Sequence, residues 1–164
     1  MNETLRLAFL ACLACNSMLF SQNFIRVTNA ANPVVTEQFE SGGGSWGDFN
    51  NDGYLDLFVA NGNLSNQNNS LFLNDRGGSF VKIFTGAVVR DGGSSIGGAW
   101  GDFNNDGGLD LFVTNRVAFG NFLYLGAGDS TFTKITASSV ATARGNSNSS
   151  SWVDYDNDSD LDLY

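Results

Sequence analysis

The sequence predicts an all-β protein that is built from repeated antiparallel units of four strands. Three observations lead to this prediction. A long segment recurs along the chain, each copy contains short runs with the two-residue alternation of strands, and Gly-rich turns separate those runs. The composition agrees, because 20 of the 164 residues are Gly, 13% are aromatic and only 15% are charged. Such a chain is too aromatic to be disordered and long enough for one ordinary domain.

The composition also excludes several functions. The chain has no histidine, which removes histidine-based acid–base catalysis, Ser–His nucleophiles and His-ligated zinc. Its net charge is −9, and its 8 Lys and Arg residues are scattered singly. Because no basic patch exists, we expect no binding to nucleic acid.

Residues 1–22 predict a signal peptide. Arg6 precedes the mostly apolar run Leu7–Phe20, and a polar exit follows. The run is shorter than the roughly 20 residues of a spanning helix and Asn16 interrupts it, so we expect no membrane span. A buried helix and a lipoprotein signal that ends at Cys15 are the alternatives. A signal peptide implies a secreted or cell-surface protein, and it contains both cysteines, so the mature chain would have none.

A unit of 52 to 54 residues repeats along the chain. Residues 46–59 read WGDFNNDGYLDLFV, residues 100–113 read WGDFNNDGGLDLFV, and a third copy, WVDYDNDSDLDLY, occupies residues 152–164. We therefore divide a repeat domain over residues 23–164 into units at about 44–97, 98–149 and 150–164, of which the last is incomplete.

Each complete unit predicts four short strands, followed here in the first unit. They lie at Gly44–Phe49, Tyr54–Ala60, Ser70–Asn74 and Ser79–Phe84. Four antiparallel strands in about 50 residues are typical of one β-propeller blade. Upstream, Phe24–Thr28 is similar to the fourth strand, and we expect it to form the outer strand of a blade.

The predicted fold is thus a partial β-propeller, with about two complete four-stranded blades plus part of a third in an open arc. Propellers close with about four to eight blades. We interpret the sequence as the amino-terminal part of a longer protein whose remaining blades are its partners; an isolated domain is the alternative. An open arc leaves apolar blade faces exposed, so we expect the isolated chain to associate.

Acidic loops connect the first two strands of each unit and predict metal sites. Oxygen-bearing side chains at loop positions 1, 3, 5 and 9 and the backbone carbonyl of position 7 can enclose one cation. Ligands that are all oxygen favour Ca²⁺, and Mg²⁺ fits a flexible loop less well. The loops hold 11 of the 14 aspartates, a crowding that is costly unless a cation neutralises it. We predict two to three Ca²⁺ ions, with these ligands: Asp48, Asn50, Asp52, Tyr54 and Asp56; Asp102, Asn104, Asp106, Gly108 and Asp110; Asp154, Asp156, Asp158, Asp160 and Asp162.

The third loop departs from the other two. Ser159 replaces the glycine of position 6, and a positive φ there costs a serine about 1 kcal/mol. Asp160 stands at position 7 and adds a carboxylate that can offset this cost. The alternative for any single loop is a solvated turn without an ion. For the repeated Trp46, Trp100 and Trp152, we favour packing between blades over stacking on a glycan.

The segments SWGDFNNDGYLDLFVANG and NSLFLNDRGGSFVKI resemble FG-GAP/VCBS repeats, the calcium-loop blades of integrin α-subunit propellers and of many secreted bacterial proteins. They are especially similar to the secreted ASPIC/UnbV and cartilage-acidic-protein-like group. The resemblance covers residues 24–164. It implies a propeller of about seven blades with Ca²⁺ in the first hairpin loop of several blades.

This resemblance implies a secreted or surface-exposed module for adhesion or for recognition of an extracellular protein or glycan. The alternative is the propeller part of an extracellular polysaccharide-active enzyme whose catalytic residues lie outside this segment; a structural spacer is a third. We expect no enzymatic activity from this segment, because it has no histidine and no paired carboxylates outside the loops.

Overall fold

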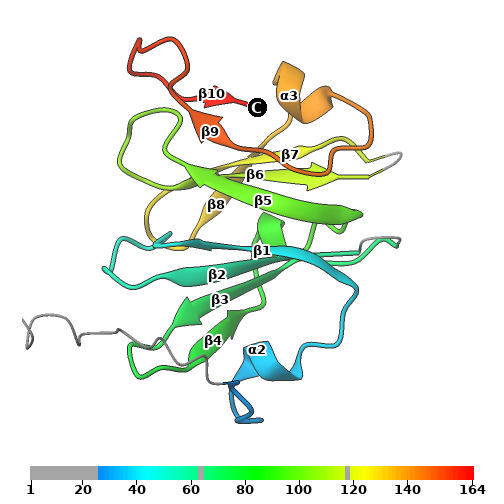
Figure 1. The fold of residues 1–164 in the computed structure, drawn as a ribbon, viewed down its shortest axis with the longest axis vertical. Coiled ribbons are helices and arrows are strands. Elements are labelled where there is room, and N and C mark those ends of the chain that lie inside the picture. Colours follow the sequence, from blue (N-terminus) through cyan, green and yellow to red (C-terminus); the bar gives the residue numbers. More distant parts are fainter. Residues whose placement is uncertain (1–25, 63–64, 117–118) are drawn as a thin grey trace, which may run out of the picture.

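The computed structural model describes residues 26–62, 65–116 and 119–164 of the chain, so the predicted signal peptide lies outside the described residues. Two four-stranded antiparallel sheets and one two-stranded hairpin follow one another along the sequence (Figure 1). The first sheet has the order β1-β2-β3-β4 and the second β5-β6-β7-β8, so each consists of neighbours in sequence. This topology confirms the all-β prediction and the two four-stranded blades.

The elements have the following bounds. The first sheet contains β1 (Ser41–Gly47), β2 (Asp56–Asn61), β3 (Ser70–Asn74) and β4 (Phe80–Ile83). The second contains β5 (Ser95–Gly101), β6 (Asp110–Asn115), β7 (Phe122–Gly126) and β8 (Phe132–Ile135). The hairpin is β9 (Trp152–Val153) and β10 (Asp162–Leu163). Single helical turns lie at α2 (Pro33–Thr36), η1 (Ala87–Val89) and α3 (Ser139–Thr142).

The acidic loops are longer than predicted, because the strands on either side of them are shorter at their loop ends. β1 ends at Gly47 instead of Phe49, and β2 begins at Asp56 instead of Tyr54. Residues between these points bond to the side chains of the loop, which takes their backbone out of the sheet. The first two strands of each unit pair in the same register in all three units. Trp46 pairs with Leu57, and the tryptophans of the other units pair with their equivalent leucines.

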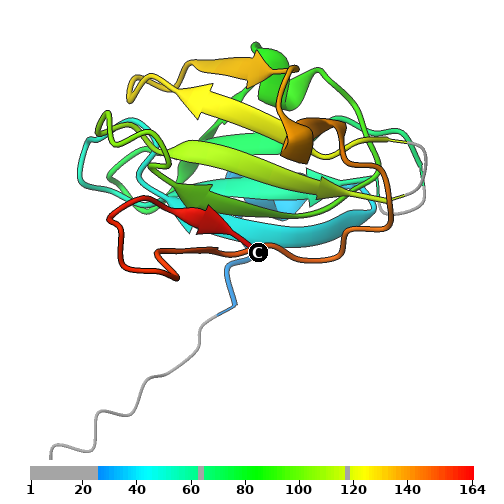
Figure 2. The same ribbon diagram turned by 90° about the horizontal axis from the view of Figure 1, so that it is seen from above.

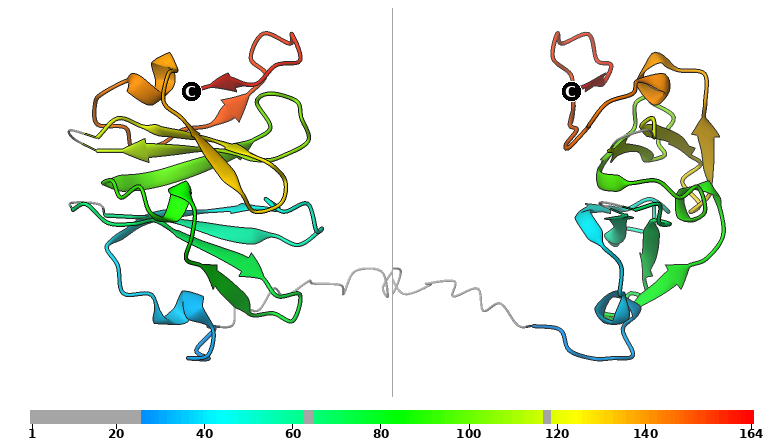
Figure 3. Two further views of the ribbon diagram at one scale, coloured as in Figure 1. Left: turned by 180° about the vertical axis from the view of Figure 1, so that it is seen from behind. Right: turned by 90° about the vertical axis from the view of Figure 1, so that its right-hand side faces the viewer.

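Successive sheets lie side by side through their first strands. β1 packs against β5, and β5 packs against β9 (Figure 1). The loops β1–β2, β5–β6 and β9–β10 consequently lie on one side of the molecule, at the left in Figures 1 and 2 and at the right in the left-hand view of Figure 3. This is the arrangement of successive blades in an open, partial propeller.

One hydrophobic core joins the two four-stranded sheets, because side chains from both sheets are buried in the same cluster. The central strands β2, β3, β6 and β7 contribute side chains with almost no exposed surface, among them Phe58, Phe72, Leu111 and Tyr124. Side chains buried on both faces of these strands explain the runs of apolar residues that the sequence shows there. No helix among the described residues is both long enough and apolar enough to cross a membrane.

Two of the three repeated tryptophans pack between sheets, as predicted. The Trp100 ring stacks on Phe49, in the acidic loop of the preceding blade, with centroids 5.4 Å apart, and Trp152 stacks on the equivalent Phe103 at 5.6 Å. Each indole N–H donates to a carbonyl oxygen of the preceding sheet's first strand, at 3.3 Å and 3.1 Å. Trp46, whose side of β1 has no preceding sheet among the described residues, is 55% exposed.

The predicted outer strand at Phe24–Thr28 is wrong over its described part, Arg26–Thr28, which has no regular secondary structure. A strand requires a neighbour that exchanges backbone hydrogen bonds with it. In the described chain no strand pairs with this segment, and α2 packs against the outer strand β4.

Candidate metal centre

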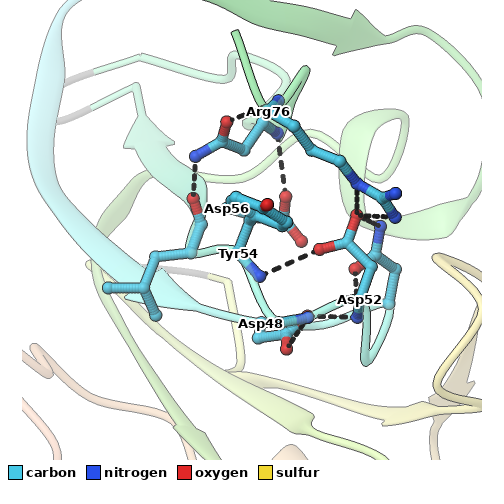
Figure 4. Close-up of polar contacts among 9 residues, drawn as sticks. Asp48, Asp52, Tyr54, Asp56 and Arg76 are labelled. Atoms are coloured by element: carbon cyan, nitrogen blue, oxygen red, sulfur yellow. Dashed lines mark hydrogen bonds and ion pairs between the residues drawn. The ribbon is translucent and has the colours of Figure 1, made fainter. Parts of the chain in front are cut away.

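The first acidic loop, between β1 and β2, is curled by hydrogen bonds from its backbone to its own side chains. The Asp48 carboxylate accepts from the N–H groups of Asp52 at 2.9 Å and Gly53 at 2.8 Å. Asn50 Oδ1 also accepts from the Asp52 N–H, at 3.1 Å, and Asp52 Oδ1 accepts from the Tyr54 N–H at 2.9 Å. Figure 4 shows the Asp48, Asp52 and Asp56 side chains with the polar contacts around them. The bonds hold positions 1, 3 and 5 in one turn.

The second loop, between β5 and β6, repeats this geometry. Asp102 accepts from the N–H groups of Asp106 at 3.0 Å and Gly107 at 2.8 Å. Asn104 Oδ1 accepts from the Asp106 N–H at 3.2 Å, and Asp106 Oδ1 accepts from the Gly108 N–H at 2.8 Å. Every bond has its counterpart in the first loop, so the conformation belongs to the repeat and not to one copy.

The aspartates of position 9 are the buried carboxylates of the first two loops. Asp56 and Asp110 begin β2 and β6, and both are 0% exposed. Asp110 accepts from the Gly126 and Phe103 N–H groups at 2.9 and 3.0 Å. Asp56 Oδ1 accepts from the Asn74 N–H at 2.9 Å, but Asp56 Oδ2 is buried without a hydrogen-bond partner. Burial raises the pKa of both carboxyls, and the other carboxylates of each loop add to this effect.

The third loop, between β9 and β10, places carboxylates closest together. Oxygen atoms of Asp154, Asp156 and Asp162 all lie within 4.8 Å of one another. The Asp154 carboxylate accepts from the N–H groups of Asp158 and Ser159, each at 3.1 Å. The pKa of Asp156 is raised, first of all by the negative charge of Asp158. Ser159 has φ 75°, close to the 87° and 88° of the equivalent glycines, which confirms the predicted positive φ.

Asp160 lies outside that cluster of carboxylates. Its Oδ1 accepts a hydrogen bond at 3.2 Å from Asn105 Nδ2, at position 4 of the second loop. Asn51, at position 4 of the first loop, donates in the same way to the Gly107 carbonyl at 3.0 Å. Both asparagines have a left-handed backbone, with φ near 57°. No sequence signal indicated these side-chain links between loops. The asparagine that recurs at position 4 does indicate the left-handed backbone, which asparagine adopts more readily than most residues.

A second missed contact joins the first loop to the β3–β4 turn. Arg76 Nη2 lies 3.0 Å from Asp52 Oδ2 (Figure 4). Partial burial alone would raise the pKa of Asp52, but hydrogen bonds from the Tyr54 N–H, Arg76 and Asn50 lower it below the ordinary value. No motif indicated this pair, because Arg76 is 24 residues away in a turn that the second unit does not conserve in sequence.

The donor set fits a hard divalent cation. It consists of carboxylate, amide and carbonyl oxygens, which Ca²⁺ accepts in numbers of six to eight. Asp56 Oδ2 is the specific observation. The Phe49 N–H lies near this carboxylate without reaching good hydrogen-bond geometry at Oδ2, and a cation would satisfy the buried oxygen.

Comparison with known protein families supports the repeat. The family model described as an FG-GAP-like repeat matches twice, over residues 48–113 and 102–164. Each match begins at the first aspartate of an acidic loop. No curated protein matches the chain. The two matches together span most of the sequence, and the chain therefore belongs to the FG-GAP-like repeat family.

Proposed function

We propose that this chain is a calcium-stabilised recognition module of an exported protein, which binds an extracellular protein or glycan. Repeats of this family suggest a propeller-type extracellular recognition module in general. The observation that carries the calcium proposal is the oxygen-lined loop with its buried, partnerless carboxylate oxygen, Asp56 Oδ2.

One ion would be held by each loop. In the first loop the ligands are the side chains of Asp48, Asn50, Asp52 and Asp56 and the Tyr54 carbonyl. The second loop offers the equivalent set, ending at Asp110. In the third loop the clustered carboxylates, together with Asp158, offer the ligands, and position 7 contributes through its carbonyl because the Asp160 carboxylate faces Asn105.

The ions would act on structure rather than on a substrate. A bound Ca²⁺ would neutralise the carboxylates in the first hairpin loop of each blade. The three loops, which lie on one side of the molecule, would then be held in a fixed conformation. We expect adhesion or recognition to use surface residues near these loops, because binding residues are often carried by loops on a rigid scaffold. We expect no catalysis from this segment, since it has no histidine and no paired carboxylates outside the loops.

Export is the remaining part of the proposal. It rests on the signal-like residues 1–22 and on the likeness to the secreted ASPIC/UnbV group. The mass of the chain recovered from the medium of an expressing host tests it: loss of about 22 residues is expected, whereas a secreted species that starts at Met1 contradicts export by cleavage.

Calcium binding is tested by calorimetry on the purified chain. We expect saturable binding of two to three ions, and Asp56→Ala and Asp110→Ala should each reduce the stoichiometry by one. Asp129→Asn is the matched control, because Asp129 caps the β7–β8 turn through Thr131 and lies outside the loops. A folded chain that binds no Ca²⁺ at millimolar concentration contradicts the proposal.

A further inference from the structure

The first loop is contacted by a cation from the β3–β4 turn, whereas in the described part of the chain no ion pair reaches the other two loops. Arg76 approaches Asp52 Oδ2 with two nitrogen atoms, Nη2 at 3.0 Å and Nε at 3.3 Å. Its guanidinium carbon also lies 5.4 Å from the centre of the Tyr54 ring. Arg76 therefore contacts the residues of positions 5 and 7, two of the predicted calcium ligands (Figure 4).

The backbone around Arg76 ties it to the loop. Asn74 Oδ1 accepts from the Arg76 N–H at 2.9 Å. The same asparagine donates its own N–H to Asp56 at 2.9 Å and its Nδ2 to the Leu55 carbonyl at 3.1 Å. The turn is thereby joined to position 9, and the arginine side chain reaches position 5 from there.

Arg76 binds the oxygen that an ion would need. Asp52 Oδ1 accepts from the Tyr54 N–H, which leaves Oδ2 to face a cation. Arg76 takes this oxygen, and the Asn50 amide adds a weaker contact at 3.2 Å. The side chain of Asp52 is only 15% exposed, whereas that of Arg76 is 59% exposed. The arginine can move into solvent, but the aspartate is held in place.

The second loop has no such competitor. The repeat offset of 52 residues places Gly128 where the first unit has Arg76. Asp106 Oδ2 accepts only from the Asn104 amide, at 2.8 Å, among the hydrogen bonds of the described residues. None of the ion pairs found in the described part of the chain involves the second or the third loop.

We propose that Arg76 is an internal cation that competes with Ca²⁺ for Asp52, so that the first loop binds calcium more weakly than the second and depends on it less. This inference rests on the calcium binding proposed above. Without calcium, Arg76 neutralises part of the loop's charge. With calcium, the guanidinium must leave Oδ2, and its nearby charge still repels the ion.

The experiment is a Ca²⁺ titration of the ¹⁵N-labelled chain, followed by the amide signals of Gly53 and Gly107. These amides donate to Asp48 and Asp102, so each reports its own loop. We expect the Gly53 signal to saturate at a higher Ca²⁺ concentration. Arg76→Gly, which copies the second unit and tolerates φ 61°, should tighten the first loop about fivefold and leave the Gly107 midpoint unchanged. Arg76→Lys keeps the charge but lacks the forked guanidinium, so its Gly53 midpoint should lie between those of the unmodified chain and Arg76→Gly.

A matched control separates the contact from net charge. Arg90→Ala removes the same charge, but Arg90 donates to the Phe84 carbonyl and does not contact a loop; both midpoints should stay unchanged. Melting in EDTA gives a second measurement, in which Arg76→Gly should melt below the unmodified chain because Asp52 has lost its counter-ion. If both amides respond to Ca²⁺ and Arg76→Gly leaves the Gly53 midpoint unmoved, the competition is refuted and calcium binding stands. If neither amide responds in any variant, both proposals fall together.

Discussion

Asp56 and Asp110 occupy the same position in successive loops, but their carboxylates meet different donors. Asp110 accepts from an N–H group at each oxygen. At Asp56 the Phe49 N–H, the equivalent of the Phe103 donor, lies close enough to favour the ionised form without reaching hydrogen-bond geometry at Oδ2. Burial raises the pKa of both groups in the ion-free chain. The stability that these two carboxyls contribute to the folded chain is therefore fully present below pH 3.8, the ordinary pKa of aspartate. It is lost as the pH rises through their raised pKa values.

Asparagine substitutions should separate these two environments. In Asp110→Asn one amide N–H must face a backbone N–H, so we expect a loss of about 1–3 kcal/mol in the free energy of unfolding in EDTA. Asp56→Asn should cost less, because Oδ1 keeps its bond from Asn74 and the buried charge disappears. It should also flatten the pH dependence described above. Urea denaturation at several pH values measures both effects; equal losses for the two variants would contradict the difference in hydrogen bonding.

At the scale of elements, the first strands approach each other closely because glycine lies beneath each interblade tryptophan. A Cβ built on Gly47 would lie 2.9 Å from the Trp100 ring, and one on Gly101 would lie 2.7 Å from Trp152 Cδ1. Both distances are below a normal carbon–carbon contact. The glycines therefore allow the stacking of Trp100 on Phe49 and its equivalent in the next blade.

Gly47→Ala should destabilise the chain through this interface. The added methyl group must displace the Trp100 ring, and overpacking of this kind costs about 1–3 kcal/mol. Gly145→Ala is the control, because a Cβ there meets no atom within 4 Å; its effect should stay within about 0.5 kcal/mol. Guanidinium denaturation followed by tryptophan fluorescence measures both. A Gly47→Ala chain as stable as the control would show that the interface can open without cost.

For the whole molecule, charge is distributed unevenly. The net charge is −9, and most aspartates lie in three loops on one side (Figures 1 and 2). Among the described residues, the three ion pairs join a basic residue to Asp52, Glu37 or Asp91, so only the first loop has a paired carboxylate. Repulsion along this side should oppose folding when no divalent ion is present.

Removal of calcium should therefore lower the melting temperature of the whole chain. One site that is bound only in the folded state contributes about 2.7 kcal/mol when free Ca²⁺ is about 100 times its dissociation constant. In EDTA, added NaCl should restore part of the lost stability, because it screens the exposed carboxylates. Calorimetric melting in Ca²⁺, in EDTA and in EDTA with salt tests this. Equal midpoints with and without Ca²⁺ would mean that the loops are ordinary turns.

The repeated motif alone determined much of this protein. Strand alternation and Gly-rich turns predicted four strands per unit, because such patterns depend on near neighbours in the chain. The fixed place of Trp100 and Trp152 in the repeat predicted packing between blades, because equivalent residues meet equivalent neighbours when repeated units stack. The positive φ of Ser159 followed from the glycines at the same position of the other loops. The set of loop oxygens could be written down from spacing before any geometry was known.

Only the tertiary structure decided which of these groups meet partners from elsewhere in the chain. Arg76 reaches Asp52 across 24 residues, Asn51 reaches Gly107 across 56, and Asp56 lacks a partner that Asp110 has. Such contacts depend on the side-chain rotamers and the relative placement of two turns, and no local periodicity encodes them. The segment Arg26–Thr28 also shows that a local pattern is not sufficient, because it has no regular secondary structure. Its sequence resembles a strand, but a strand forms only where another strand offers backbone hydrogen bonds.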